Sequence, residues 1–240
     1  MSRHKSIAII SILIFLCSCV ALLGGMGLGL GLRDAFDQLT SNQAIEDTSE
    51  HTTNSPAAGR KLLLLEDNFS QQQWEITVDA DHDKRYENGR YVITARVDNY
   101  SFWSLAEESL ENFVVEIETT QLAGPNENDY GLILRHQDDA NFYTFEISGD
   151  GFYSFSKLVE DEYLEIIPWQ ESEAIRQGEQ KNRLRLKADG PNFTFYVNDE
   201  LIDGAIDPTF SQGDIGLVVG AFDEPGVSIA FDNLKVWALE

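Results

Sequence analysis

The chain has 240 residues, 42% of them hydrophobic and 24% charged, and its 41 acidic residues outnumber 17 basic ones, so the formal net charge is −24. Because it lacks the basic groups that neutralise a phosphate backbone, we exclude nucleic acid as a partner. The only cysteines, Cys17 and Cys19, precede every acidic residue, which excludes a disulfide framework in the acidic part of the chain.

Residues 6–32 form a long, uncharged and apolar run. As a helix they would extend about 40 Å, enough to cross a hydrocarbon core of about 30 Å. Arg3 and Lys5 precede this run, so the positive-inside rule places residues 1–5 in the cytoplasm. We predict a single-pass signal-anchor in the cell membrane, with the C-terminal domain on the extracytoplasmic side.

The stretch Leu16-Cys17-Ser18-Cys19 also resembles a bacterial lipobox, in which Cys19 would carry the lipid. Against this alternative, residues 20–32 stay apolar where lipoproteins usually turn polar. A cleaved secretory signal is disfavoured for a similar reason, since the apolar core continues past any such site. An anchored and a lipidated chain would both place the acidic part outside the cell.

The acidic part divides into a linker and a domain. Residues 33–59 are polar and acidic and end near Pro56 and Gly59, which predicts a flexible linker. Residues 60–240 contain no second linker and are numerous enough to bury a core of their own. They predict one extracytoplasmic domain.

The pattern inside this domain is that of β-strands. Apolar and polar residues alternate strictly over 183–188 and 193–197, with Asp189-Gly190-Pro191 as the turn between them. About a dozen such runs, spaced by about 10–15 residues, predict an all-β, two-sheet antiparallel sandwich. The only helix expected in the domain is a short one around Glu171–Gln177.

Several stretches resemble one group of sandwich proteins: Asp67-Asn68-Phe69-Ser70 with Trp74, Tyr130–Arg135, Asp138–Tyr143, Gly149–Tyr153, Asn182–Arg185, Gly213–Leu217 and Phe231–Val236. These stretches are similar to concanavalin A-like, laminin-G-like jelly rolls, among them 3-keto-disaccharide hydrolases and laminarinase-type glycoside hydrolases. The resemblance covers residues 61–239 and implies a jelly-roll sandwich. It implies less about activity, because this fold carries lectins, enzymes and adhesion modules.

No catalytic motif accompanies this resemblance. Laminarinase-type enzymes carry Glu-x-Asp-x-x-Glu on one strand, which places the carboxylates on one face. The nearest string here, Glu160–Glu165, has Glu in place of the assisting Asp. The four histidines also lack metal-ligand spacing. We therefore predict a binding module rather than an enzyme, and keep a 3-keto-disaccharide hydrolase, without assigned catalytic residues, as an alternative.

Sugar sites on such sandwiches combine an aromatic platform with polar groups that hold the sugar hydroxyls. Trp103 and Trp169 are the candidate platforms, with packing in the core as their alternative role. Arg135 and His136 are the candidate polar groups. These residues predict recognition of a glycan or an envelope polysaccharide. A structural or adhesive module that binds an envelope protein is the alternative.

A structural calcium ion is a further expectation. The resembling folds bind Ca²⁺ on their convex side through backbone carbonyls and one Asp of the final strand, and Asp232 matches that position. Carbonyl groups near Asp67 would supply further oxygens, of which Ca²⁺ takes six to eight. The alternative role of Asp232 is to accept hydrogen bonds from the neighbouring backbone.

Overall fold

The computed structural model describes residues 62–239, which form an all-β domain. Between these residues there is no helix, and hence none that is long and apolar enough to cross a membrane. The anchor predicted at residues 6–32, the lipobox with Cys19 and the linker at 33–59 lie outside the described residues. These three features stay predictions.

Strands make up most of the described chain. The fifteen strands are β1 (Leu63–Asp67), β2 (Thr77–Val78), β3 (His82–Glu87), β4 (Arg90–Ala95), β5 (Tyr100–Leu110), β6 (Phe113–Ala123), β7 (Asn128–Asp138), β8 (Asn141–Ile147), β9 (Phe152–Val159), β10 (Glu162–Glu171), β11 (Lys181–Asp189), β12 (Asn192–Val197), β13 (Glu200–Ile206), β14 (Gly213–Ala221) and β15 (Val227–Ala238).

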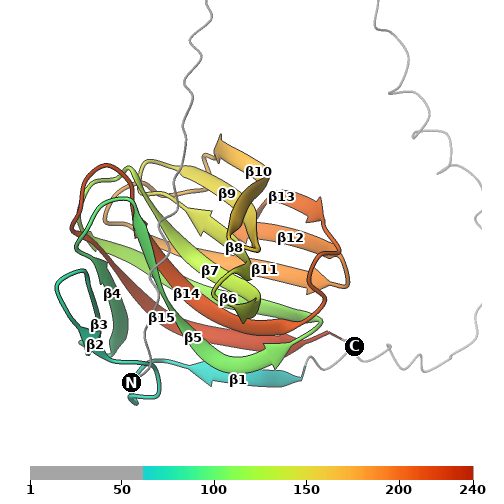
Figure 1. Ribbon diagram of the computed structural model, residues 1–240. Helices are drawn as coiled ribbons and strands as arrows, with labels where there is room; N and C mark the ends of the chain where they lie inside the picture. The colour runs from blue at the N-terminus through green and yellow to red at the C-terminus, as the bar shows by residue number, and fades with distance from the viewer. Residues whose placement is uncertain (1–61, 240) are drawn as a thin grey trace, which may run out of the picture. The chain divides into compact units, whose positions relative to one another are not determined.

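The strands form two antiparallel sheets packed face to face (Figure 1). Sheet A has nine strands, in the order β13-β12-β11-β6-β15-β4-β3-β2, with β1 pairing with β15. Sheet B has six, in the order β10-β9-β8-β7-β14-β5. Neighbours such as β6 and β15 are far apart in sequence, as in a jelly roll. The predicted all-β, two-sheet antiparallel jelly-roll sandwich is confirmed.

Strict alternation explains how each strand contributes to the core. Leu184, Leu186 and Ala188 of β11 are fully buried, while the residues between them are partly exposed. Aromatic side chains bridge the two sheets: the ring of Phe145 lies 4.8 Å from that of Phe195 between centroids. Burial of this apolar surface is the main term that stabilises the sandwich.

The first and last strands of the domain are direct neighbours. In the pairing of β1 with β15, Leu63 lies opposite Trp237 and Asp67 opposite Leu234. The described chain therefore begins and ends on one sheet.

We expect residues 60–240, expressed without the preceding segment, to give a soluble protein that unfolds in one cooperative transition, because both sheets and the core lie within them. Circular dichroism during heating and size-exclusion chromatography would check this. A fragment that aggregates, while the detergent-purified full chain unfolds cooperatively, would show that the first sixty residues complete the core.

The prediction of a short helix around Glu171–Gln177 was wrong. Strand β10 runs to Glu171, and a turn follows in which the N–H of Ile175 donates to the carbonyl of Ser172. The side-chain amide of Asn182 then bonds both the N–H and the carbonyl of Arg176, at 2.9 and 2.8 Å. These bonds satisfy backbone groups that a helix would otherwise satisfy, so the loop is stable without one.

The apolar pattern of the sequence does not predict two of the strands, β3 and β5. Strand β3 reads His-Asp-Lys-Arg-Tyr-Glu, and its charges are compensated by ion pairs such as Lys84 with Glu75. Strand β5 carries serines and glutamates over half of its length. Pairing with a neighbouring strand, β4 for β3 and β14 for β5, defines both strands in place of an apolar run.

Candidate functional site

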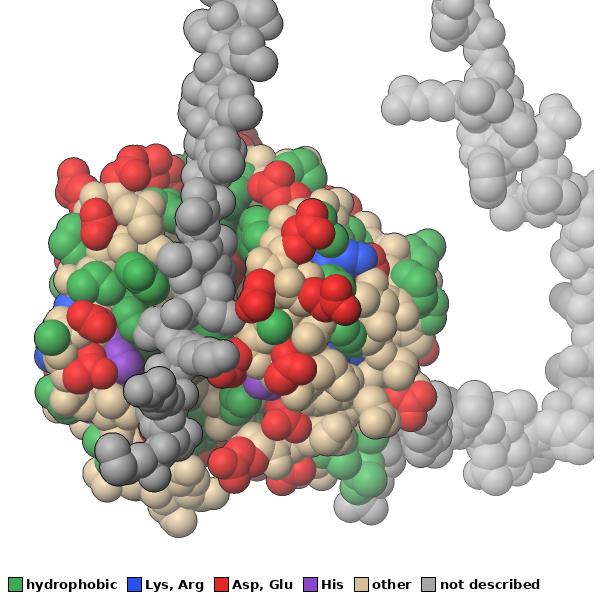
Figure 2. Space-filling model, in the orientation of Figure 1, with side chains coloured by type: hydrophobic (Ala, Val, Ile, Leu, Met, Phe, Trp, Pro, Cys, Tyr) green, Lys and Arg blue, Asp and Glu red, His purple; other side chains and the backbone are tan. Residues whose placement is uncertain are grey.

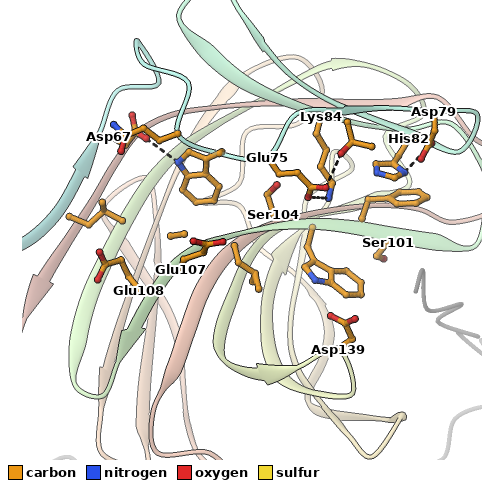
Figure 3. Close-up of a pocket in the computed structure, with 18 residues that line it drawn as sticks. Asp67, Glu75, Asp79, His82, Lys84, Ser101, Ser104, Glu107, Glu108 and Asp139 are labelled. Atoms are coloured by element: carbon orange, nitrogen blue, oxygen red, sulfur yellow. Dashed lines mark hydrogen bonds and ion pairs between the residues drawn. The ribbon is translucent and has the colours of Figure 1, made fainter. Parts of the chain in front are cut away.

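A cavity of about 830 Å³ lies between β5 and the chain around β1, β2 and β3. We name it the β5 groove (Figure 3). Strand β5 contributes every residue from Ser101 to Glu108. The other lining residues are Leu65, Asp67, Gln73, Trp74, Glu75, Thr77, Asp79, His82, Lys84 and Asp139.

The groove follows the edge of a sheet. Among the described strands, β5 pairs with β14 alone and is the last strand of sheet B. Its pairing is regular from Tyr100 to Leu105 and is then interrupted by a bulge in which Glu107 has a φ of +57°. Bulges and charges at an edge discourage pairing with another chain. Side chains therefore define most of what this groove can recognise.

The wall opposite β5 begins with a fixed carboxylate. Asp67 accepts hydrogen bonds from the N–H of Phe69 at 2.6 Å and from the indole Nε1 of Trp74 at 2.9 Å. Trp74 is buried against Phe69 and Tyr91, with ring centroids 5.7 and 5.6 Å away. These contacts make Trp74 a structural residue that shapes the groove.

Farther along the wall, two pairs place charge at the cavity (Figure 3). The ammonium of Lys84 lies 2.7 Å from Glu75, and His82 Nδ1 lies 3.1 Å from Asp79. His82 also stacks on Phe102, with 4.5 Å between centroids. Burial lowers the pKa of His82 despite the nearby acids, so this imidazole is neutral at pH 7.

Acidic groups dominate the groove. Lys84 is its single lysine or arginine, against six Asp and Glu residues: Asp67, Glu75, Asp79, Glu107, Glu108 and Asp139. Figure 2 shows acidic side chains over much of the visible face, with few basic ones. Such a field repels uronic acids and sulfated sugars and admits neutral or cationic ligands.

Trp103 lies where the groove meets the face of sheet B that points away from sheet A, here named the outer face. It is half-buried, and its ring lies 5.6 Å from that of Phe142. His136 also stacks on Phe142, with 5.5 Å between ring centroids, and its Nε2 lies 3.6 Å from Asp139. The structure thus brings Trp103 and His136 together through Phe142. His136 is buried, at only 9% exposed.

Arg135 lies elsewhere, in the interior of the domain. Its side chain is fully buried and donates to the carbonyls of Phe210, Glu111 and Gly190, each at 2.8 Å. The guanidinium also lies over the ring of Phe193. Its positive φ of 50° turns the side chain inward at the end of the regular β7 pairing. These contacts describe a residue that joins three loops, outside the β5 groove.

Trp169 and Asp232 are also not among the groove-lining residues. Trp169 lies on β10, at the opposite edge of sheet B from β5, and packs edge-on against Phe222. Asp232 accepts a hydrogen bond from the N–H of Asn233 at 2.8 Å. Within residues 62–239, no cluster of three or more His, Cys, Asp or Glu residues has the geometry of a metal site. Calcium at Asp232 stays a prediction.

Most of the groove-lining residues carry no local signal in the sequence. Glu107, Glu108, Asp139 and Lys84 belong to separate segments whose charges resemble ordinary solvated loops. Of the groove-lining residues, the sequence singled out only Trp103 as a candidate for ligand contact. The contact between β5 and the chain around β3 is tertiary, and no local pattern encodes it.

Two antiparallel sheets in this strand order, with a groove at one edge, define a concanavalin A-like jelly-roll sandwich. No family model matches the chain, and no curated protein sequence matches it.

Solved structures share the fold. The carbohydrate-binding module CBM66 from Bacillus subtilis is 22% identical, with 69% of this chain and 95% of the module covered and a TM-score of 0.55. A Bacillus subtilis protein of unknown function with a galectin-like fold is 11% identical, with coverages of 74% and 96% and a TM-score of 0.57.

An endo-β-galactosidase from Clostridium perfringens that releases GlcNAcα1-4Gal is 12% identical, with a TM-score of 0.53. The match covers 78% of this chain and 66% of the enzyme. At such identities the likeness shows the fold and leaves the ligand to be argued from the groove.

Proposed function

We propose that this chain is a binding module that recognises a neutral or amino-substituted polysaccharide in the β5 groove, without catalysis. The observation that carries the proposal is the position of Trp103 at the mouth of a cavity of about 830 Å³ lined by carboxylates. An aromatic ring beside hydrogen-bonding oxygens is the usual arrangement for a pyranose ring and its hydroxyls. Fold neighbours that include a carbohydrate-binding module support this proposal.

The same proposal includes the anchor. Residues 6–32 would hold the chain in the cell membrane, and the acidic linker at 33–59 would let the domain reach polysaccharide outside the cell. An acidic module is repelled by anionic lipid and anionic envelope polymers. It therefore suits neutral or amino-substituted glycans.

A glycan array probed with the detergent-purified full chain would test this. We expect saturable binding to neutral or amino-substituted polysaccharides and none to sulfated or uronic ones. Trp103→Ala should weaken binding at least about tenfold, because a central aromatic anchor is worth about 2 kcal/mol or more. Trp169→Ala is the matched control, since it removes an indole outside the groove and should leave the affinity unchanged.

Equal binding by wild type and Trp103→Ala would place the ligand elsewhere on the domain. Absence of binding to every polysaccharide would instead favour an adhesive, protein-binding module. The observation behind that alternative is the free edge of β5, to which an extended peptide could add as a strand. The bulge and the carboxylates at Glu107 and Glu108 oppose such pairing, so we favour the glycan.

A further inference from the structure

Two buried carboxyl groups lie on the outer face of sheet B, next to Ser101 of the β5 groove lining but not themselves part of it. Asp129 of β7 and Glu146 of β8 are 6% and 3% exposed. Gly131 is directly opposite Glu146, and Asp129 lies two residues from Gly131 on the same strand face. The two carboxyls are thus diagonal neighbours, whose Cβ atoms lie about 7–8 Å apart or somewhat less in a regular sheet.

No basic side chain compensates this pair. The strands of sheet B contain two such residues, Arg135 and Lys157. Arg135 binds three carbonyls in the interior, and Lys157 pairs with Asp207 at 2.7 Å. Buried charges in proteins are normally paired or bound to a metal. The described part of the chain supplies no basic partner, so the carboxyl pair is neutralised either by protons or by a bound cation.

Two oxygens of this patch are unsatisfied. Oδ1 of Asp129 and Oγ of Ser154 are buried without a hydrogen-bond partner, whereas Oδ2 of Asp129 accepts from the hydroxyl of Ser101 at 3.5 Å. Ser154 is 0% and Thr144 is 4% exposed. Ser154 pairs directly with Glu146, and Thr144 lies two residues from Glu146 on the same strand face. These hydroxyls and carboxyls line one patch, and all of the unpartnered atoms in it are oxygens.

Glycines on the neighbouring strand positions let the two carboxyl side chains lie flat against the sheet. Gly131 separates Val218 from Glu146 in one cross-strand row, and Gly220 separates Ser101 from Asp129 in the next. A Cβ at Gly220 would lie 1.7 Å from Oδ1 of Asp129, so this carboxyl occupies the space that a side chain would take. Because these side chains are at least nine-tenths buried, a sugar ring cannot reach their oxygens, whereas a small ion can.

We propose that Asp129, Glu146, Ser154 and Thr144 form a binding site for a hard divalent cation within sheet B. Carboxylate, hydroxyl and water oxygens are the ligands that Ca²⁺ and Mg²⁺ prefer. The site is distinct from Asp232, which lies on β15 of sheet A. It joins the row that runs from Trp103 through Val218 and Gly131 to Glu146, so an ion here would brace the strands beneath the proposed platform.

Protons compete with the cation for this site. Burial raises the pKa of Asp129 to about 7, and burial together with the charge of Asp129 raises the pKa of Glu146 well above its ordinary value. From β10, Tyr163 and Glu165 are the titratable groups nearest to the pair, and burial keeps Tyr163 protonated. Cation binding must therefore release protons and must weaken at acidic pH.

Calorimetric titration of the metal-stripped full chain with CaCl₂, and separately with MgCl₂, would test the site. At about pH 7.5 we expect saturable binding with proton release, a higher melting temperature and at least about tenfold weaker binding at about pH 5.5. Asp129→Asn and Glu146→Gln should each weaken binding at least about tenfold. Asp232→Asn is the matched control and should bind as wild type does.

Failure to bind either ion up to about 10 mM, well above the range of extracellular calcium modules, would overturn the proposal. So would binding that Asp232→Asn removes and Asp129→Asn retains. Should either carboxyl variant fail to fold, the proton release by wild type still decides, because burial raises the pKa of Asp129 to about 7 and a cation bound there must displace its proton. Glycan affinity, measured separately, distinguishes loss of this site from failure of the proposed function.

Discussion

Arg135→Ala is expected to destabilise the domain by at least about 3 kcal/mol, because the substitution leaves three carbonyl acceptors without their charged donor and opens a cavity beside Phe193. The three acceptors lie in separate loops, at Glu111, Gly190 and Phe210. One side chain therefore connects segments up to about a hundred residues apart in sequence. Urea unfolding, followed by fluorescence, would measure the change in the free energy of unfolding.

Arg183→Ala is the control for this prediction. Arg183 lies on β11 with a side chain 37% exposed, and it pairs with Asp199 and Glu116 at the surface. Surface pairs of this kind contribute about 1 kcal/mol or less. Arg135→Lys keeps the charge but loses the planar fork, so it should also destabilise the domain. If Arg135→Ala and Arg183→Ala cost the same, the buried network would not have the role that its geometry indicates.

The stability of the cation-free domain should fall as the pH rises from about 4 to about 7. Burial raises the pKa of Asp129 from 3.8 to about 7. Over this range the unfolded chain has lost that proton while the folded chain still holds it, so deprotonation favours unfolding. Above about pH 7 both states are ionised at Asp129 and its contribution becomes constant. Melting temperatures in chelator across this range would check the prediction.

Two variants separate Asp129 from the other carboxyls. Asp129→Asn removes one of two groups with a raised pKa and should make the decline between about pH 4 and about pH 7 shallower, with Glu146 contributing the rest. The contribution of Asp207 to stability depends on pH in the opposite direction. Burial alone would raise its pKa, but Lys157, Thr209 and Tyr143 lower it to about 2. The stabilisation from Asp207 is present above about pH 4 and is lost as the pH falls toward 2. Asp207→Asn should therefore change the stability profile only at acidic pH, below about 4. An unchanged profile in Asp129→Asn would contradict the assignment.

Much of the sandwich could be predicted because its strands carry a local signal. Alternation over 183–188 and 193–197 matches β11 and β12, and the turn at Gly190 matches the observed hairpin. Strand β5 lacks such a signal, since Glu107 and Glu108 stand where an apolar pattern would continue. Its strand character depends on the register with β14.

The candidate sites differ from the strands in this respect. Trp103 could be selected as an exposed aromatic residue, but its place at the groove depends on how β5 faces β3. Arg135 and His136 look alike in sequence as polar residues after an apolar strand. A positive φ at Arg135 sends one side chain into the interior, while the other packs on Phe142. Arg135 and His136 are consecutive in the chain, yet the φ of Arg135 gives the two side chains unrelated roles.

The sequence by itself determined the acidic character of the chain, the all-β class and the sandwich, because charge and side-chain alternation are local properties. Only the tertiary structure decided which residues meet. Asp129 and Glu146 belong to two separate strands, and the antiparallel register of β7 and β8 places them on one buried face. A shift of that register by one residue would turn either carboxyl to the opposite face of the sheet. Register is a property of paired strands, so no single stretch of sequence contains it.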